Sequence, residues 1–180
     1  MDYKRLIWEG HHYRFGLAGE DQADAIQTLL DGHPGRALNV GCGPWGDKLR
    51  NLAPHCLSLF AADKAKEAVR LAAAQACAAR VHLVVAEGDR LPFGTASFDY
   101  VLALGLFAEV RNPEAVIQEM SRVCRSGAHV MITNAVMHPR TRFQAAGEAS
   151  RLELVDDQEG YCPAASGIVK RRYLLVFRKC

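Results

Sequence analysis

The stretch from Arg36 to Gly46 constrains the fold of this chain more than any other. It begins with a short, mostly apolar run that suits a strand, passes through the glycines Gly41, Gly43 and Gly46, and leads into a polar run that suits a helix. Because glycine has no side chain, the main-chain N–H groups of such a turn can approach a ligand closely. Glycines at this spacing also mark ordinary turns, so the pattern favours a nucleotide-like ligand only if its surroundings agree.

The surroundings supply an acidic residue at a suitable distance. Residues 57–62 form an apolar run typical of a second buried strand, and the run ends at Asp63, about twenty residues after the glycines. In a nucleotide-binding α/β fold, a carboxylate at this position accepts hydrogen bonds from ribose hydroxyls. Asp63 is also a favoured N-cap residue for the alanine-rich helix expected over residues 64–80, and it can serve in both ways.

The rest of the chain alternates strands with helices. Helices are expected over residues 20–30 and over residues 112–123, the second with Ser126 and Gly127 after its end. Further strands are expected at residues 81–85, 98–104, 129–133, 151–155 and 172–177, with a loop beginning at 156–160 between the last two. The nearly continuous apolar character of the middle strands indicates burial on both faces. The pattern predicts an α/β fold, Rossmann-like and doubly wound, with a mostly parallel seven-stranded sheet.

Length and composition limit the functions that the chain can have. A length of 180 residues suits one domain, and a formal net charge of +2 makes nucleic acid or an anionic membrane an unlikely main partner. No segment has the length and apolar continuity of a membrane span, and the first residues lead into no signal-peptide core, so we expect a cytoplasmic protein. The six cysteines are scattered without metal-ligand spacing, so no metal site is expected.

Two later blocks narrow the choice of ligand. Residues 87–101 read EGDRLPFGTASFDYV, and residues 112–127 read NPEAVIQEMSRVCRSG. Together with NVGCG at residues 39–43, they resemble the signature blocks of class I S-adenosylmethionine-dependent methyltransferases, and most of all the small-molecule branch called methyltransferase type 11. The resemblance covers residues 36–133 in unbroken order. It implies an antiparallel last strand, a cofactor-binding core over residues 36–134 and final strands over residues 150–180.

The resemblance also implies a cofactor site, with S-adenosylmethionine as the cofactor. The implied residues are Gly41, Cys42, Gly43, Asp63, Lys64, Gly88, Asp89, Arg90 and Leu104. Gly41 and Gly43 would approach the methionine end, with Cys42 lining the site without acting as a nucleophile. Asp63 would bind the ribose hydroxyls and Asp89 the adenine amino group, although Asp89 after a glycine also suits a plain turn. Leu104 would lie near the sulfonium.

Three positions depart from the family pattern. Asn39 stands where the family usually has an acid, Pro44-Trp45-Gly46 replaces a shorter Thr-Gly turn, and Ser126-Gly127-Ala128 replaces Pro-Gly-Gly. None of these changes removes Asp63 or Asp89. We therefore still expect cofactor binding.

Methyl transfer needs positioning and desolvation more than a dedicated nucleophile. Where a base helps, His11 and His12 are the catalytic candidates by expected location, with His138 as another and Glu109 as a substrate-side candidate. For each histidine, a surface or packing role is the alternative. His11 and His12 belong to residues 1–19, which show no periodicity; we interpret them as an arm over the ligand cleft, the alternative being a terminus whose aromatic residues cover core edges.

The sequence thus predicts methyl transfer from S-adenosylmethionine to an unidentified acceptor, most simply a small molecule. A cofactor-binding accessory subunit without its own turnover is one alternative, and a small NAD-binding domain is another. The short segment between the fifth and sixth strands leaves the pocket open or completed by a second copy or a partner chain. Basic clusters at residues 140–142 and 170–172 suit an RNA substrate, but solvated charge at element ends explains them more simply.

The expected arm can be tested by deletion. Removing residues 1–15 should abolish methyl transfer while circular dichroism shows a preserved fold, because the arm would close the acceptor pocket. Full activity in the truncated protein would contradict the arm and would exclude His11 and His12 as bases.

Overall fold

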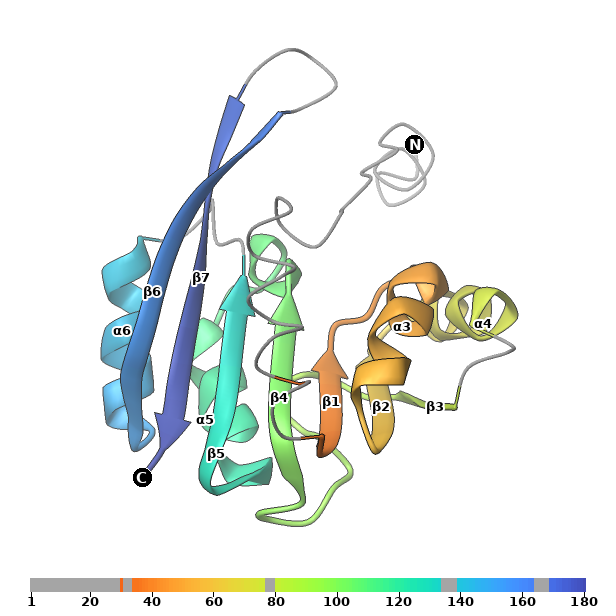
Figure 1. Ribbon diagram of the computed structural model, residues 1–180, viewed down its shortest axis with the longest axis horizontal. Coiled ribbons are helices and arrows are strands. Elements are labelled where there is room, and N and C mark those ends of the chain that lie inside the picture. The colour runs from red at the N-terminus through yellow and green to blue at the C-terminus, as the bar shows by residue number, and fades with distance from the viewer. Residues whose placement is uncertain (1–29, 31–33, 77–79, 134–138, 164–168) are drawn as a thin grey trace.

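The structure is a computed structural model that describes residues 30, 34–76, 80–133, 139–163 and 169–180 (Figure 1). These residues form one seven-stranded sheet with the order β3-β2-β1-β4-β5-β7-β6. The strands are β1 (Arg36–Val40), β2 (Ser58–Asp63), β3 (Val81–Val85), β4 (Phe98–Leu104), β5 (Cys124–Thr133), β6 (Leu152–Pro163) and β7 (Val169–Lys179). Neighbours from β3 to β5 pair in parallel, and β7 is antiparallel to both β5 and β6. The predicted mostly parallel sheet with an antiparallel last strand is confirmed.

Helices cover both faces of the sheet. The helices are α3 (Gly46–Leu52), α4 (Lys66–Gln75), α5 (Pro113–Val123) and α6 (Arg140–Ala149), with short 3-10 turns η1 (Ala53–His55) and η2 (Leu106–Ala108). Alternate residues of β1 face opposite layers: Ala37 packs in a buried cluster with α3 and α4, and Leu38 in a second cluster with α5 and α6. Burial on both sides explains why the inner strands are apolar at nearly every position. In the described part of the chain, no helix is long and apolar enough to cross a membrane.

The start of β5 differs from the prediction. The strand begins at Cys124, directly after α5, whereas the apolar run predicts a start at His129. Gly127, expected beyond the helix end, lies inside β5 with a φ of 78°. The C-cap of α5 is Cys124, whose backbone is already extended. The pairing with β4 is irregular here, because its register shifts between Phe98 and Tyr100. An irregular ladder has no clean alternation, so periodicity misses it.

The last two strands are longer than predicted, and the helix before them was not predicted. Residues 156–160, expected to separate the last two strands, pair with β7 within a hairpin that runs past the end of β5 (Figure 1). Asp157 is accommodated because Arg140 of α6 lies 2.8 Å from its Oδ2. In α6, Phe143, Ala146 and Gly147 form the buried stripe, and a Cβ on Gly147 would lie 2.6 Å from Phe177. This spacing was the available signal for the helix.

An ion pair on α5 holds the loop that follows β3. Glu119 Oε1 accepts a 2.7 Å hydrogen bond from Leu91 N, and Arg122 Nη2 donates to Leu91 O at 3.2 Å. The two side chains also pair with each other at 2.7 Å, and Glu119 is only 13% exposed. The hydrogen bond from Arg122 lowers the pKa of Glu119 below its ordinary 4.5. The clamp fixes the loop that carries Gly88 and Asp89.

The clamp predicts a stability difference that depends on pH. Glu119→Gln should lower the free energy of unfolding at pH 7 by about 1 to 2 kcal/mol, because a charged acceptor of hydrogen bonds is lost. A carboxylate whose pKa is lowered on folding contributes its full stabilisation at pH values above its ordinary pKa near 4.5. This stabilisation is lost as the pH falls through the folded-state pKa, so the difference in unfolding free energy between the parent and Glu119→Gln should disappear in acid. Urea titrations at several pH values measure it.

Glu67→Gln is the matched control. Glu67 makes the same i, i+3 pair with Arg70, but both side chains are more than half exposed, so little change is expected. Equal destabilisation by the two variants would contradict the clamp.

Candidate cofactor site

Three parallel strands end together at one edge of the sheet. Val40 at the end of β1 pairs with Ala62, and Asn39 pairs with Leu102 two residues before the end of β4. The ends of β1, β2 and β4 therefore form one row, followed by the glycine loop, Asp63 and Gly105. In open α/β sheets, ligands bind beyond this carboxyl edge.

The glycine loop folds back onto the end of β2. Gly41 N and Cys42 N both donate to Ala62 O, at 2.8 and 3.0 Å. Gly41 and Gly43 have φ values of 71° and 58°, and a Cβ on Gly41 would overlap Leu106 Cδ1. The loop needs glycine at Gly41 for both conformation and space.

Asp63 joins the loops that follow three strands. Its Oδ2 accepts a 2.9 Å hydrogen bond from Gly43 N, and its Oδ1 accepts one of 2.9 Å from Ala65 N. Its main-chain oxygen accepts a 3.0 Å hydrogen bond from Ala86 N, at the start of the loop after β3. The N-cap alternative is wrong, because α4 begins at Lys66 and its N-cap is Ala65, so Asp63 binds the N–H of the N-cap residue and none within the helix. Each carboxylate oxygen keeps a further lone pair for a ligand hydroxyl.

The far end of the glycine loop is anchored on α4. Gly46 N donates to Gln75 Oε1 at 3.1 Å. A Cβ on Gly46 would overlap the main-chain oxygen of Ala72 and lie 2.9 Å from Ala76 N. Close contact between two backbones fixes this end of the loop.

Asn39 carries a buried acceptor without a partner. Its side chain is 4% exposed, it lies two residues before Gly41, and its Oδ1 makes no hydrogen bond. Buried polar atoms are normally satisfied, so an orphaned acceptor here fits a ligand that donates hydrogen bonds. Sequence reasoning noted Asn39 only as a departure from the family pattern. That departure was the available signal, since a polar residue interrupted an apolar strand.

The loop after β3 reaches the same edge. A Cβ on Gly88 would lie 3.4 Å from Val40 Cγ1, which places this loop beside the end of β1. Arg90 N donates to Glu87 O at 3.1 Å, forming a turn that leaves Asp89 and Arg90 exposed. Asp89 therefore does form part of a turn, as one interpretation of the sequence predicted, and its exposed side chain is also accessible to a ligand.

Leu104 ends β4 and is partly buried, whereas Lys64 is exposed. Cys42 is 4% exposed, and burial together with the negative charge of Asp63 raises the pKa of its thiol to about 12. The thiol is neutral at physiological pH. It therefore lines the loop without nucleophilic character.

Several predictions concern residues that the structure does not describe. The predicted helix over residues 20–30 lies almost wholly outside the described residues, as do His11, His12, His138 and the expected arm, whereas Glu109 is exposed after η2.

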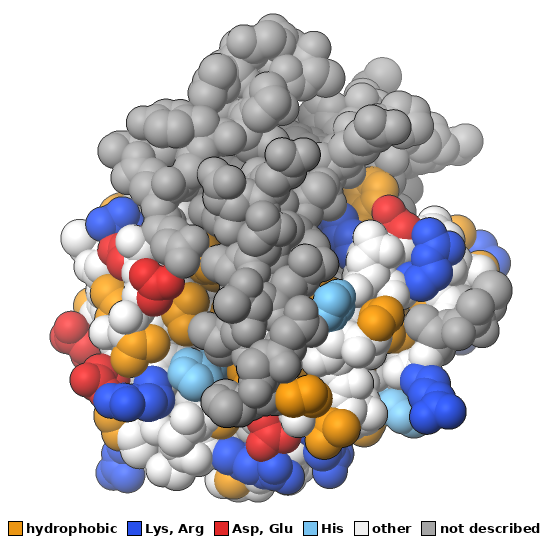
Figure 2. All heavy atoms as spheres, viewed as in Figure 1, with side chains coloured by type: hydrophobic (Ala, Val, Ile, Leu, Met, Phe, Trp, Pro, Cys, Tyr) orange, Lys and Arg blue, Asp and Glu red, His pale blue; other side chains and the backbone are white. Residues whose placement is uncertain are grey.

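Arg140 and Arg142 form ion pairs with Asp157 and Glu114 at 2.8 and 2.6 Å. Among the described side chains on the face in Figure 2, positive and negative charges are interspersed around the rim. This arrangement fits solvated structural charge better than an RNA surface.

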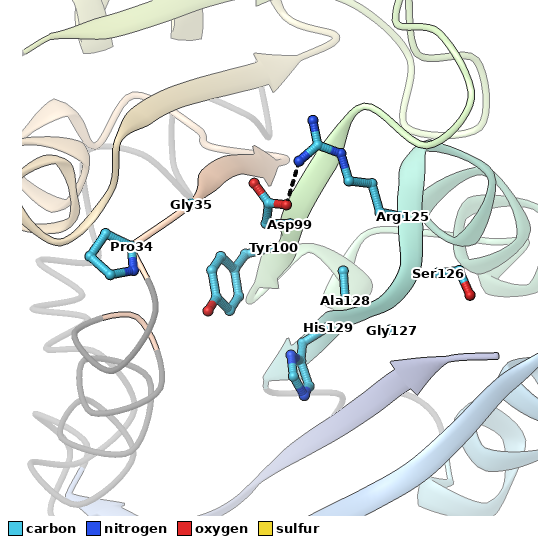
Figure 3. A pocket seen from close by; sticks show the side chains of 9 residues that line it. All are labelled: Pro34, Gly35, Asp99, Tyr100, Arg125, Ser126, Gly127, Ala128 and His129. Atoms are coloured by element: carbon cyan, nitrogen blue, oxygen red, sulfur yellow. Dashed lines mark hydrogen bonds and ion pairs between the residues drawn. The ribbon is translucent and has the colours of Figure 1, made fainter.

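A hollow of about 420 Å³ lies at the opposite edge of the sheet (Figure 3). It is lined by Pro34, Gly35, Asp99, Tyr100, Arg125, Ser126, Gly127, Ala128 and His129. Asp99 lies within β4 and accepts hydrogen bonds from Arg36 N at 2.8 Å and Arg125 Nη1 at 2.6 Å, tying the starts of β1 and β5. The hollow is therefore separate from the carboxyl-edge site.

Comparison with known families decides the identity of the fold and its site. The family described as "Methyltransferase domain" matches residues 38–132, from β1 through β5. The chain belongs to this methyltransferase family. The cofactor of the family is S-adenosylmethionine.

Two curated relatives of this chain are N-methyltransferases by name. The phosphatidylethanolamine N-methyltransferase of Cereibacter sphaeroides is 33% identical over 138 residues, covering 73% of this chain and 65% of the relative. The ajmaline N-methyltransferase of Rauvolfia serpentina is 32% identical over 107 residues, covering 57% of this chain and 37% of the relative. The chain spans less than two thirds of the length of either relative.

Solved structures share the fold of this chain. N-methyltransferase NodS from Bradyrhizobium japonicum has a TM-score of 0.70 at 18% identity, covering 89% of this chain and 96% of that one. Geranyl diphosphate C-methyltransferase from Streptomyces coelicolor, solved with S-adenosyl-L-homocysteine, has a TM-score of 0.71 at 12% identity, covering 89% of this chain and 78% of that one. At these identities the likeness is one of fold.

The contact between Gly46 and α4 can be tested by a substitution that adds one methyl group. Gly46→Ala should lower the free energy of unfolding by about 1 to 3 kcal/mol, because the backbone of α4 cannot move away easily. Thermal or urea unfolding measures the change. Gly94→Ala, where a Cβ would meet only Ser97 Oγ at 3.4 Å, is the control and should be nearly neutral. A neutral Gly46→Ala would mean that the loop is not fixed at this end.

Proposed function

We propose that this protein transfers the methyl group of S-adenosylmethionine to a nitrogen atom of a small molecule. The observation that carries the proposal is the hydrogen bond from Gly43 N to Asp63 Oδ2. It joins the glycine loop to a carboxylate with spare acceptor capacity, at the edge where α/β folds bind nucleotide-like ligands. The names of the two N-methyltransferase relatives support nitrogen as the accepting atom.

In this proposal each part of the edge has one task. Gly41, Cys42 and Gly43 lie against the methionine end, and Asp63, with Lys64 beside it, binds the ribose hydroxyls. Asp89 accepts from the adenine amino group, with Gly88 and Arg90 shaping its turn. Leu104 lies near the sulfonium. The orphaned Oδ1 of Asn39 accepts a donor group of the cofactor, as a neutral replacement for the usual acid.

The chemistry then requires little of the protein beyond geometry. S-adenosylmethionine supplies a methyl group on a positively charged sulfur. An amine acceptor attacks through its lone pair, so the protein must hold it unprotonated, in line and away from water. His11 and His12 are proposed to accept the proton that the amine loses. The inert thiol of Cys42 is consistent with direct transfer.

The surroundings of the site complete the proposal. We infer a single domain over residues 1–180, with residues 1–19 or a second copy of the chain closing the acceptor pocket. A cytoplasmic location and a small-molecule acceptor belong to the same proposal.

Cofactor binding is the first test. Calorimetric titration should detect S-adenosylmethionine and S-adenosylhomocysteine, and Asp63→Ala should weaken binding by about 1.5 to 3 kcal/mol, because hydrogen bonds to a charged group are lost. Asp99→Ala is the matched control, since Asp99 also accepts two hydrogen bonds but lies at the opposite edge. Equal weakening by both variants would place the ribose elsewhere. Binding of NAD instead would support the alternative of a small NAD-binding domain.

Methyl transfer is the second test. The protein, S-adenosylmethionine labelled in the methyl group and an amine panel are incubated together, with phosphatidylethanolamine in mixed micelles, free ethanolamine and a tertiary-amine alkaloid as the first acceptors. Label should appear in at least one amine. Tight cofactor binding without transfer to these amines or to amines of a cell extract would overturn the proposal in favour of an accessory subunit.

A further inference from the structure

Trp45 lies against the glycine loop beside the proposed ribose carboxylate. A Cβ on Gly43 would lie 2.9 Å from Trp45 Cδ1 and 3.1 Å from its Nε1, so the indole occupies the space over Gly43. Gly43 N in turn donates to Asp63 Oδ2. The ring, the loop backbone and the carboxylate therefore form one contiguous group.

Both ends of the short segment around Trp45 are held. The loop is tied to Asp63 at Gly43 and to α4 at Gly46, through Gln75 Oε1. Lys48 Nζ lies 5.2 Å from the centre of the Trp45 ring, within range of a cation–π interaction. These contacts restrict where the indole can go without moving the loop.

The core does not explain Trp45. The residue is only partly buried and belongs to neither of the two buried clusters. It is the N-cap of α3, yet its side chain makes no capping hydrogen bond there. A large, restricted and partly exposed aromatic ring beside a ligand-binding edge is typical of a binding-site wall.

We propose that the indole of Trp45 forms one wall of the cofactor site and is covered when S-adenosylmethionine binds. The inference rests on the proposed function and adds a residue to it. The ring supplies an apolar face to the cofactor, and its N–H supplies a donor at the rim. Lys48 holds the ring in its place over Gly43.

Tryptophan emission tests the proposal directly. The chain has two tryptophans, so Trp8→Phe leaves Trp45 as the sole emitter. On titration with S-adenosylhomocysteine or S-adenosylmethionine, its emission should shift to shorter wavelength and acrylamide should quench it less, because water is displaced from the ring. The change should saturate with the dissociation constant found by calorimetry on the same variant.

Affinity provides the second readout. Trp45→Ala should weaken cofactor binding about tenfold, whereas Trp45→Phe, which keeps an aromatic face, should stay within about threefold. Leu57→Ala removes an exposed apolar side chain, 73% accessible, between η1 and β2 and should bind as the parent does. Calorimetric saturation with unchanged Trp45 emission and quenching overturns this inference alone. Absence of calorimetric binding overturns the proposed function together with it.

Discussion

The carboxylate of Asp63 is the constraint on which the rest of the site depends. Its side chain holds the loop after β1 and the approach to α4, and its main-chain oxygen holds the start of the loop after β3. A residue that ends a central strand can make all these contacts, because β2 lies between β1 and β3. The three loops that would surround a nucleotide-like ligand therefore meet at one residue. Few other positions in the sheet could join them.

The clamp on α5 explains why two separate sequence blocks belong together. The Glu-x-x-Arg pair in the second block, Glu119 and Arg122, binds both main-chain polar groups of Leu91 in the first. Leu91 is buried, and the exposed turn with Asp89 lies just before it. The helix thus positions the turn by satisfying its backbone. The two sequence blocks are therefore joined in the structure through the contact of Glu119 and Arg122 with Leu91.

The sequence predicted the centre of the molecule better than its edges. β4 was found at both ends, because Phe98 to Leu104 is apolar, buried and bounded by turn residues. The spacing predicted Asp63 at the end of the strand that follows the glycine loop, and β2 ends there. Its hydrogen bond with Gly43 N was not predicted. β5 was found only from His129, since the irregular pairing around Gly127 hides the strand before it. Residues 156–160 were expected to lie between two strands and are part of β6. The strand was missed here because its pairing with β7 and the ion pair of Asp157 with Arg140 depend on distant parts of the chain.

Side-chain partners in the site were the least predictable part. The lone acceptor of Asn39 and the role of Glu119 are set by what lies across the sheet or on the next helix, which a linear pattern does not record. The ligand roles of the carboxyl-edge residues remain predictions. His11 and His12 remain predictions as well, because they lie outside the described residues.

The two anchors of the glycine loop divide it into parts of unequal freedom. Gly43 is tied to β2 through Asp63, and Gly46 is tied to α4, so only Pro44 and Trp45 lie between fixed points. Both anchors are donated by main-chain N–H groups, so an exchange of the two side chains between them removes neither hydrogen bond. The side chains at this point of the loop can therefore change while the loop keeps its attachments to β2 and α4.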